Sequence, residues 1–153
     1  MCIDSSPIVI KNNNIYKNKK KIKNISFICL KAQSSKLLTL GNFDIIYSRF
    51  FLHTINKVAQ DKIFKHLIKL TKTNSIICFE FRTIKDSLYF KGTTIGKHER
   101  ITDHYRRFID LDELLNLSYV KNNFSVIYKI EDKNLAKYKN ENPVVARLVL
   151  GRL

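Results

Sequence analysis

Six short apolar runs divide the chain, and each has the length and composition of a β-strand. They are residues 1–4, 24–30, the run that begins at residue 43, 74–81, 124–130 and 144–150. Polar connections separate these runs, and no run is long enough to span a membrane. The pattern therefore predicts a sheet protein whose strands are joined by other elements.

Two of the connecting segments carry capping signals for a helix. Ser5 or Ser6 can cap a helix with Pro7 at its first position, where the missing N–H has no cost. Further along, Asp110 and Glu113 have the spacing of a capping pair before an apolar stretch. A helix is therefore predicted to begin at Pro7 and another directly after Asp110.

A third helix is predicted after residue 54, and its apolar positions define an inward face. Thr54 or Asn56 can cap it. The positions that recur at steps of three and four are Ile55, Val58, Ala59, Ile63, Leu67 and Leu70. Residues 84–109, in contrast, show no clean period.

The order of these elements predicts the fold class. Strands joined by helices indicate an α/β, Rossmann-like doubly wound sheet that is mostly parallel. No helix separates 124–130 from 144–150, so these two strands are expected to form an antiparallel pair at one edge. No internal repeat or linker interrupts the chain, and residues 1–153 are expected to form a single, partial domain.

The net charge of +15 has two interpretations. It is typical of a protein that binds nucleic acid or another acidic partner, because each phosphate contact releases counterions. Alternatively, a bias towards A/T-rich codons explains it, since Lys, Asn and Ile dominate and the basic residues are spread along the chain. We favour the second interpretation, and nucleic acid remains the less favoured partner.

Cysteine and histidine usage points away from metal chemistry. Cys29 and Cys78 lie in apolar runs and are expected to be buried, reduced thiols. Neither the three cysteines nor the four histidines show a ligand spacing such as H-E-x-x-H, so no metal site is predicted. The amino terminus lacks the basic leader of a signal peptide, and a cytoplasmic location is expected.

The segments "CIDSS", "FICLKAQ" and "FDIIYSRFFLHTI" together resemble the class I S-adenosylmethionine-dependent methyltransferase family, entered at its second strand. The resemblance covers essentially the whole chain. It implies that S-adenosylmethionine is the cofactor and that Asp4, Ser5 and Ala32 contact it, with Asp4 on the ribose hydroxyls. Taken alone, Asp4 is equally typical of a residue that caps a helix.

The same resemblance implies two departures from the family pattern. Lys31 follows the second apolar run, where an acidic residue usually accepts a hydrogen bond from the adenine amino group. The first strand and its glycine-rich loop are absent, and none of the four glycines forms a G-x-G arrangement. We therefore expect a domain that is incomplete at its amino terminus, and activity of this chain is left open.

The stretch "FDIIYSRFFLHTI" resembles the family's fourth strand and the turn that follows it. The resemblance implies that Tyr47, Ser48 and Arg49 contact the cofactor and that His53 faces the methyl-transfer cleft. An alternative is that His53 simply caps the next helix. The carboxyl ends of strands line the ligand crevice in open α/β sheets, which supports the first interpretation.

An acceptor site is expected beyond the 74–81 strand. Glu80 and Arg82 lie at that strand's end, and Tyr105 and Arg106 follow in a long connection. Arginine and imidazole groups suit an anionic or hydroxyl-rich acceptor, such as a small or saccharide-like molecule. His53 or His104 could remove a proton from an acceptor hydroxyl.

Two further hypotheses belong to other classes. The first is a non-catalytic basic domain that binds nucleic acid or an acidic partner, with affinity that falls steeply as salt rises. The second is a nicotinamide-dependent Rossmann enzyme, which lacks its G-x-G-x-x-G signature here. S-adenosylmethionine-dependent methyl transfer is the function the sequence favours.

Overall fold

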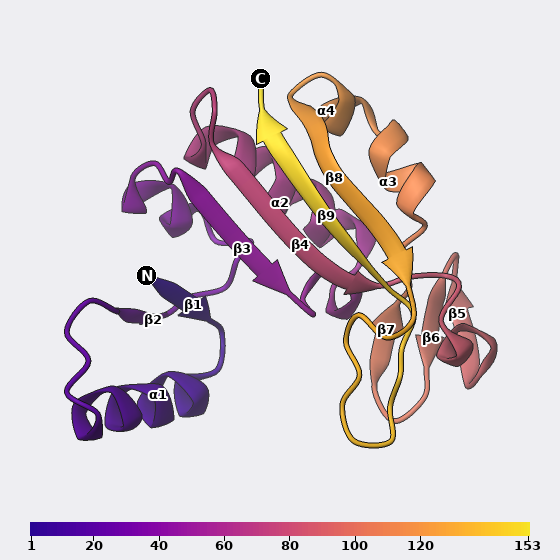
Figure 1. Cartoon of the computed structure of the whole chain (residues 1–153), viewed down its shortest axis with the longest axis horizontal. Helices are drawn as coiled ribbons and strands as arrows, with labels where there is room; N and C mark the ends of the chain where they lie inside the picture. Colours follow the sequence, from indigo (N-terminus) through magenta and orange to yellow (C-terminus); the bar gives the residue numbers. More distant parts are fainter. The chain divides into compact units, whose positions relative to one another are not determined.

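The computed structural model describes all 153 residues and divides them into two compact units, residues 1–41 and 42–153. Figure 1 shows the helices and strands of both units. The hydrogen-bonded strands form three sheets, with two, four and three strands.

The first unit is one strand–helix–strand element followed by a short 3-10 helix. β1 (Cys2–Asp4) and β2 (Phe27–Cys29) pair in parallel, and α1 (Pro7–Lys19) connects them. The 3-10 helix covers Ser35–Leu40. Ser6 caps α1, since its hydroxyl accepts a hydrogen bond from a first-turn N–H at 3.3 Å. The predicted cap and parallel pair are therefore confirmed, although β2 is shorter than the apolar run suggested.

The second unit is built on a four-stranded sheet in the order β3-β4-β9-β8 (Figure 1). β3 (Ile45–Arg49) and β4 (Ile76–Arg82) are parallel. β9 (Val145–Arg152) lies antiparallel between β4 and β8 (Phe124–Asp132). The mixed α/β class and the antiparallel carboxy-terminal pair at one edge are thus confirmed.

Three helices accompany this sheet. α2 (Lys57–Leu70) connects β3 to β4, and Asn56 caps it by accepting a hydrogen bond from a backbone N–H at 2.9 Å. α3 (Leu111–Asn116) and α4 (Ser118–Lys121) precede β8. Of the two caps that the sequence allowed for α2, Asn56 is therefore the one used.

The core of the second unit lies between α2 and one face of the sheet. Phe64 of α2 is fully buried and stacks on Phe79 of β4, with ring centroids 5.6 Å apart. Leu148 of β9 is opposite Phe79 in the register and is also fully buried. Val58, predicted to face inward, is 77% exposed, because the buried face of α2 instead begins at Gln60.

The segment without a clean period forms a separate three-stranded antiparallel sheet. A 3-10 helix (Ser87–Phe90) leads into β5 (Thr93–Gly96), β6 (Glu99–Ile101) and β7 (Tyr105–Arg107). Strands of three or four residues are too short to show a period of two. The long connection without a clean period therefore contains a sheet of its own.

The cysteines are less buried than the sequence predicts. All three cysteines are free, but Cys29 is exposed and Cys78 is half-buried. The prediction that both are buried is therefore wrong, because Cys29 ends a two-stranded sheet and Cys78 points away from the core. None of the helices combines the length and the apolar character that crossing a membrane requires.

Candidate functional site

A cavity of about 350 Å³ lies at the carboxyl ends of β3 and β4. Arg49 ends β3 and Arg82 ends β4, and the connection between β8 and β9 supplies another part of the lining. Five residues predicted from the sequence line it together: Arg49, His53, Arg82, His104 and Arg106. We call this the arginine cavity.

Arg49 is held in place by Glu80, a buried carboxylate at the end of β4. Its Nε donates to Glu80 at 2.7 Å, and Arg147 of β9 donates to the other oxygen at 2.7 Å. Burial alone would raise the pKa of Glu80, but the two guanidinium groups outweigh it and hold the pKa below its usual value. The terminal nitrogens of Arg49 have no hydrogen-bond partner in the protein and remain able to bind a ligand.

His53 lies in a 3-10 turn (Leu52–Thr54) and is buried against the cavity wall. Its Nδ1 accepts a hydrogen bond from the backbone N–H of Arg82 at 3.3 Å, and Phe50 packs edge-on at 5.6 Å. Burial lowers the pKa of His53 to about 4, and the positive charges of Arg82 and Arg106 act in the same direction. The ring is therefore neutral near pH 7, with its proton on Nε2.

His104 has the opposite arrangement. It is exposed, and its Nδ1 lies 2.8 Å from a carboxylate oxygen of Asp103. A carboxylate only accepts hydrogen bonds, so Nδ1 carries the proton and the lone pair of Nε2 is free. Hydrogen bonds from Arg106 and Thr102 keep the pKa of Asp103 below its usual value. His104 is thus able to accept a proton.

Two carboxylate groups hold the Arg82 side chain in the arginine cavity. Its guanidinium contacts Asp86 at 3.2 Å and Glu141 at 2.6 Å. Glu141 belongs to the β8–β9 connection, which also brings Lys137 and Tyr138 to the lining. Sequence reasoning missed these three residues, because their segment has no apolar period or motif that would mark it.

Four other predicted residues of the second unit do not line this cavity. Tyr47 is largely exposed on β3, whereas the Ser48 hydroxyl is buried without a hydrogen-bond partner. Tyr105 donates its hydroxyl proton to Glu99 at 2.9 Å, and burial together with this hydrogen bond raises the pKa of Tyr105. Glu80 does not line the cavity itself, but its carboxylate holds Arg49, which does.

The predicted cofactor contacts of the first unit cluster after its two strands. Asp4 ends β1, and one of its carboxylate oxygens accepts a hydrogen bond from the Ser6 backbone N–H at 2.7 Å. The carbonyl of the neighbouring Ser5 accepts a weak hydrogen bond from the Cys29 thiol at 3.7 Å. Ala32 follows β2. Asp4 therefore has a local role in the turn and a second oxygen that remains available.

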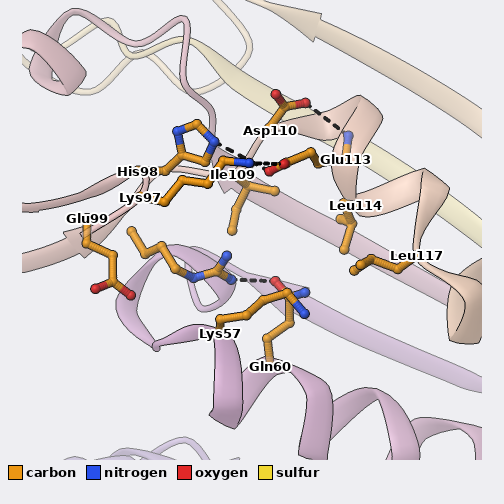
Figure 2. Close-up of a pocket in the computed structure, with 11 residues that line it drawn as sticks. Lys57, Gln60, Lys97, His98, Glu99, Ile109, Asp110, Glu113, Leu114 and Leu117 are labelled. Carbon is orange, nitrogen blue, oxygen red and sulfur yellow. Dashed lines mark hydrogen bonds and ion pairs between the residues drawn. The ribbon is translucent and has the colours of Figure 1, made fainter.

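A second cavity, also of about 350 Å³, lies between α2, the β5–β6 turn and α3 (Figure 2). Gln60 forms its floor and accepts a hydrogen bond from the buried guanidinium of Arg107. His98, Asp110 and Glu113 gather at another part of the lining. The sequence predictions did not include this cluster, because Asp110 and Glu113 were assigned to a helix cap and nothing in the sequence places His98 beside them.

The chain has the fold of S-adenosylmethionine-dependent methyltransferases, as its similarity to their solved structures shows. Among the similar solved structures is a methyltransferase from Methanosarcina mazei, with a TM-score of 0.78, 12% identity, 99% of this chain covered and 80% of that one. A methyltransferase from Clostridium acetobutylicum gives 0.71 and 12%, covering 97% and 73% of the two chains. One from Anabaena variabilis gives 0.70 and 16%, covering 99% and 67%.

The sequence itself matches no known family. No protein-family model and no curated protein matches it. The TM-scores of 0.70 to 0.78 show a shared fold, and identities of 12% to 16% show no closer relation than that.

Proposed function

We propose that this chain takes part in S-adenosylmethionine-dependent methyl transfer to a small anionic acceptor, such as a phosphorylated or acidic saccharide. The observation that supports the proposal most directly is the position of the arginine cavity at the carboxyl ends of β3 and β4. Ligands of open α/β sheets bind at this edge. Five residues selected from the sequence converge there, within the fold of a methyltransferase.

The chain offers a polar group that fits the cofactor. The Asp4 carboxylate uses one oxygen within the protein, so the other is available for the ribose hydroxyls. When bound, S-adenosylmethionine supplies a methyl group already activated by its sulfonium.

The charge of the arginine cavity favours an anionic acceptor. Three arginines and Lys137 line it, against the single carboxylate of Glu141. Arg49 and Lys137 have charged nitrogens that no protein carboxylate occupies fully, and these suit a phosphate or carboxylate group. The remaining arginines are fixed by their carboxylate partners and shape the lining.

The two histidines suit different roles in this proposal. His104 accepts the proton of an acceptor hydroxyl at Nε2, because Asp103 holds the proton of the same ring on Nδ1. His53 donates a hydrogen bond from Nε2–H, because its Nδ1 accepts from the Arg82 backbone. The sequence offered either histidine as the base, and the hydrogen bonds favour His104.

Calorimetry tests the cofactor part of the proposal. S-adenosylmethionine is expected to bind saturably, and Asp4→Ala is expected to weaken binding at least about tenfold, since a charge-assisted hydrogen bond contributes roughly 1.5–3 kcal/mol. Asp44→Ala is the matched control, because Asp44 is an exposed acid before β3. S-adenosylmethionine and an oligonucleotide are each titrated at low and at high salt.

This titration also separates the proposal from a basic domain that binds nucleic acid. That alternative predicts no cofactor binding, together with binding of an oligonucleotide that weakens steeply as salt rises. Equal effects of Asp4→Ala and Asp44→Ala would contradict the role of Asp4. Absence of any cofactor binding would contradict the proposed function as a whole.

The acceptor part is tested with a hexose phosphate and with the corresponding uncharged hexose. Lys137→Gln is expected to weaken binding of the phosphate about tenfold, because a charge-assisted hydrogen bond is lost. The effect on the uncharged sugar is expected to be small. Lys133→Gln, in the same exposed connection but outside the cavity lining, should leave both affinities unchanged.

Two results would speak against an anionic acceptor. One is equal affinity for the charged and the uncharged sugar. The other is an equal loss of hexose phosphate binding in Lys133→Gln and Lys137→Gln, which would indicate general attraction by the basic surface rather than a site.

A further inference from the structure

The geometry points to a binding site for a divalent transition-metal ion, of which Zn²⁺ is the best match, formed by His98, Asp110 and Glu113. The site lies in the second cavity, away from the arginine cavity and from the residues of the proposed methyl transfer. It does not depend on the proposed function. Figure 2 shows the three side chains converging from the β5–β6 turn and from the start of α3.

The distances among the three side chains are compatible with one ion. Each offers one ligand atom, and these atoms lie within 4.8 Å of one another. In the tetrahedral geometry that Zn²⁺ prefers, bonds of about 2.0–2.2 Å to nitrogen and oxygen place two ligands about 3.3–3.6 Å apart. The Nε2 of His98 and an oxygen of Glu113 already have this spacing, at 3.4 Å. The most distant pair of ligand atoms needs to approach by at most about 1.5 Å, which side-chain rotation can provide.

His98 is oriented as a metal ligand would be. Its Nδ1 is 3.0 Å from the Tyr89 hydroxyl, an interaction that fixes the plane of the ring. Its Nε2 is buried and has no hydrogen-bond partner, although a Glu113 oxygen lies 3.4 Å away. In the tautomer whose Nδ1–H is donated to the Tyr89 hydroxyl, the Nε2 lone pair faces the Glu113 carboxylate, and a cation bound between these two groups would remove their repulsion.

The two carboxylates are also held in position. One Asp110 oxygen accepts a hydrogen bond from the Glu113 backbone N–H at 3.0 Å, which leaves its other oxygen for a metal. Glu113 pairs with Lys97, whose side chain is 72% exposed. Lys97 can move into solvent when a cation takes its place, so it is expected to compete with the metal.

The ligand set determines the class of ion. One imidazole and two carboxylates suit Zn²⁺ and similar first-row ions, whereas Mg²⁺ prefers oxygen ligands and retains its waters. The adjoining cavity has room for solvent ligands that complete the coordination. A bound ion would join the β5–β6 turn to α3.

Zn²⁺ titration of the full chain, with the exposed Cys2 and Cys29 replaced by serine, tests the site. One equivalent of Zn²⁺ is expected to bind and to raise the melting temperature, and Mg²⁺ is expected to bind far more weakly. Glu113→Gln and His98→Asn should each weaken Zn²⁺ binding at least tenfold. Asparagine is chosen because position 98 has a φ of 61°, which asparagine tolerates well.

Matched variants separate this site from general attraction to acidic or histidine side chains. Asp112→Asn changes an acidic residue that lies on the same helix turn as Glu113 but outside the cluster. His104→Asn removes an exposed histidine that is not part of the cluster. Both should bind Zn²⁺ with unchanged affinity. Lys97→Gln is a surface change that removes the competing charge, and it should strengthen Zn²⁺ binding severalfold.

Three results would overturn the inference. The first is no saturable Zn²⁺ binding in the serine background or in its Lys97→Gln derivative. The second is a loss in Asp112→Asn as large as in Glu113→Gln. The third is weaker binding in Lys97→Gln, which would show that the lysine does not compete with the ion.

Discussion

Replacing Phe64 with alanine is expected to lower the free energy of unfolding of the second unit by about 3–5 kcal/mol. Phe64 is fully buried and packs on three aromatic rings, those of Phe79, Tyr119 and Phe124. Its removal loses the transfer free energy of a large side chain and leaves a cavity between α2 and the sheet. Urea denaturation followed by far-UV circular dichroism measures the change.

Phe90→Ala is the control for this experiment. Phe90 is 82% exposed at the end of a 3-10 helix, so its replacement is expected to change the free energy of unfolding by no more than about 0.5 kcal/mol. Similar destabilisation by the two variants would mean that Phe64 is not a central residue of the core.

The second large effect is a loss of stability in mild acid that depends on His53. Its pKa is 6.5 in the unfolded chain and about 4 in the folded chain, so the unfolded chain binds the proton first as pH falls. Stability is therefore fully present above pH 6.5 and is lost as pH falls towards 4. At 1.36 kcal/mol per pKa unit the total is about 3 kcal/mol.

Urea denaturation at pH 7, 6 and 5 isolates this contribution. His53→Gln is expected to flatten the pH dependence over this range, although it also lowers stability at pH 7 by removing a buried ring. Phe90→Ala, an exposed substitution, should retain the slope. An unchanged slope in His53→Gln would rule out His53 as its source.

Much of the fold could be predicted from the sequence, because its strands are continuous apolar runs and its caps use standard residues. Ser6, Asn56 and Asp110 each cap the helix expected at that place. The side chains of α2 were harder to assign. Val58 is apolar and fits the helical spacing, whereas Gln60 is polar, yet packing leaves Val58 exposed and buries Gln60.

The sequence predicts those residues of the arginine cavity that lie at the ends of strands. Arg49 and Arg82 end their strands, and parallel strands bring such residues to one edge. The contribution of Lys137 and Glu141 was not predictable, because a connection without period gives no indication of where it folds back. The roles of the histidines likewise depend on hydrogen bonds to Asp103 and to the Arg82 backbone.

The position of β9 in the sheet has a consequence for synthesis. β9 lies between β4 and β8, yet a ribosome makes it after both. Until it emerges, β4 and β8 cannot be joined, and each exposes a free edge to which another nascent chain could pair. Productive folding of this unit must therefore await its last strand, and chaperone capture should be strongest on nascent chains that stop just short of residue 145.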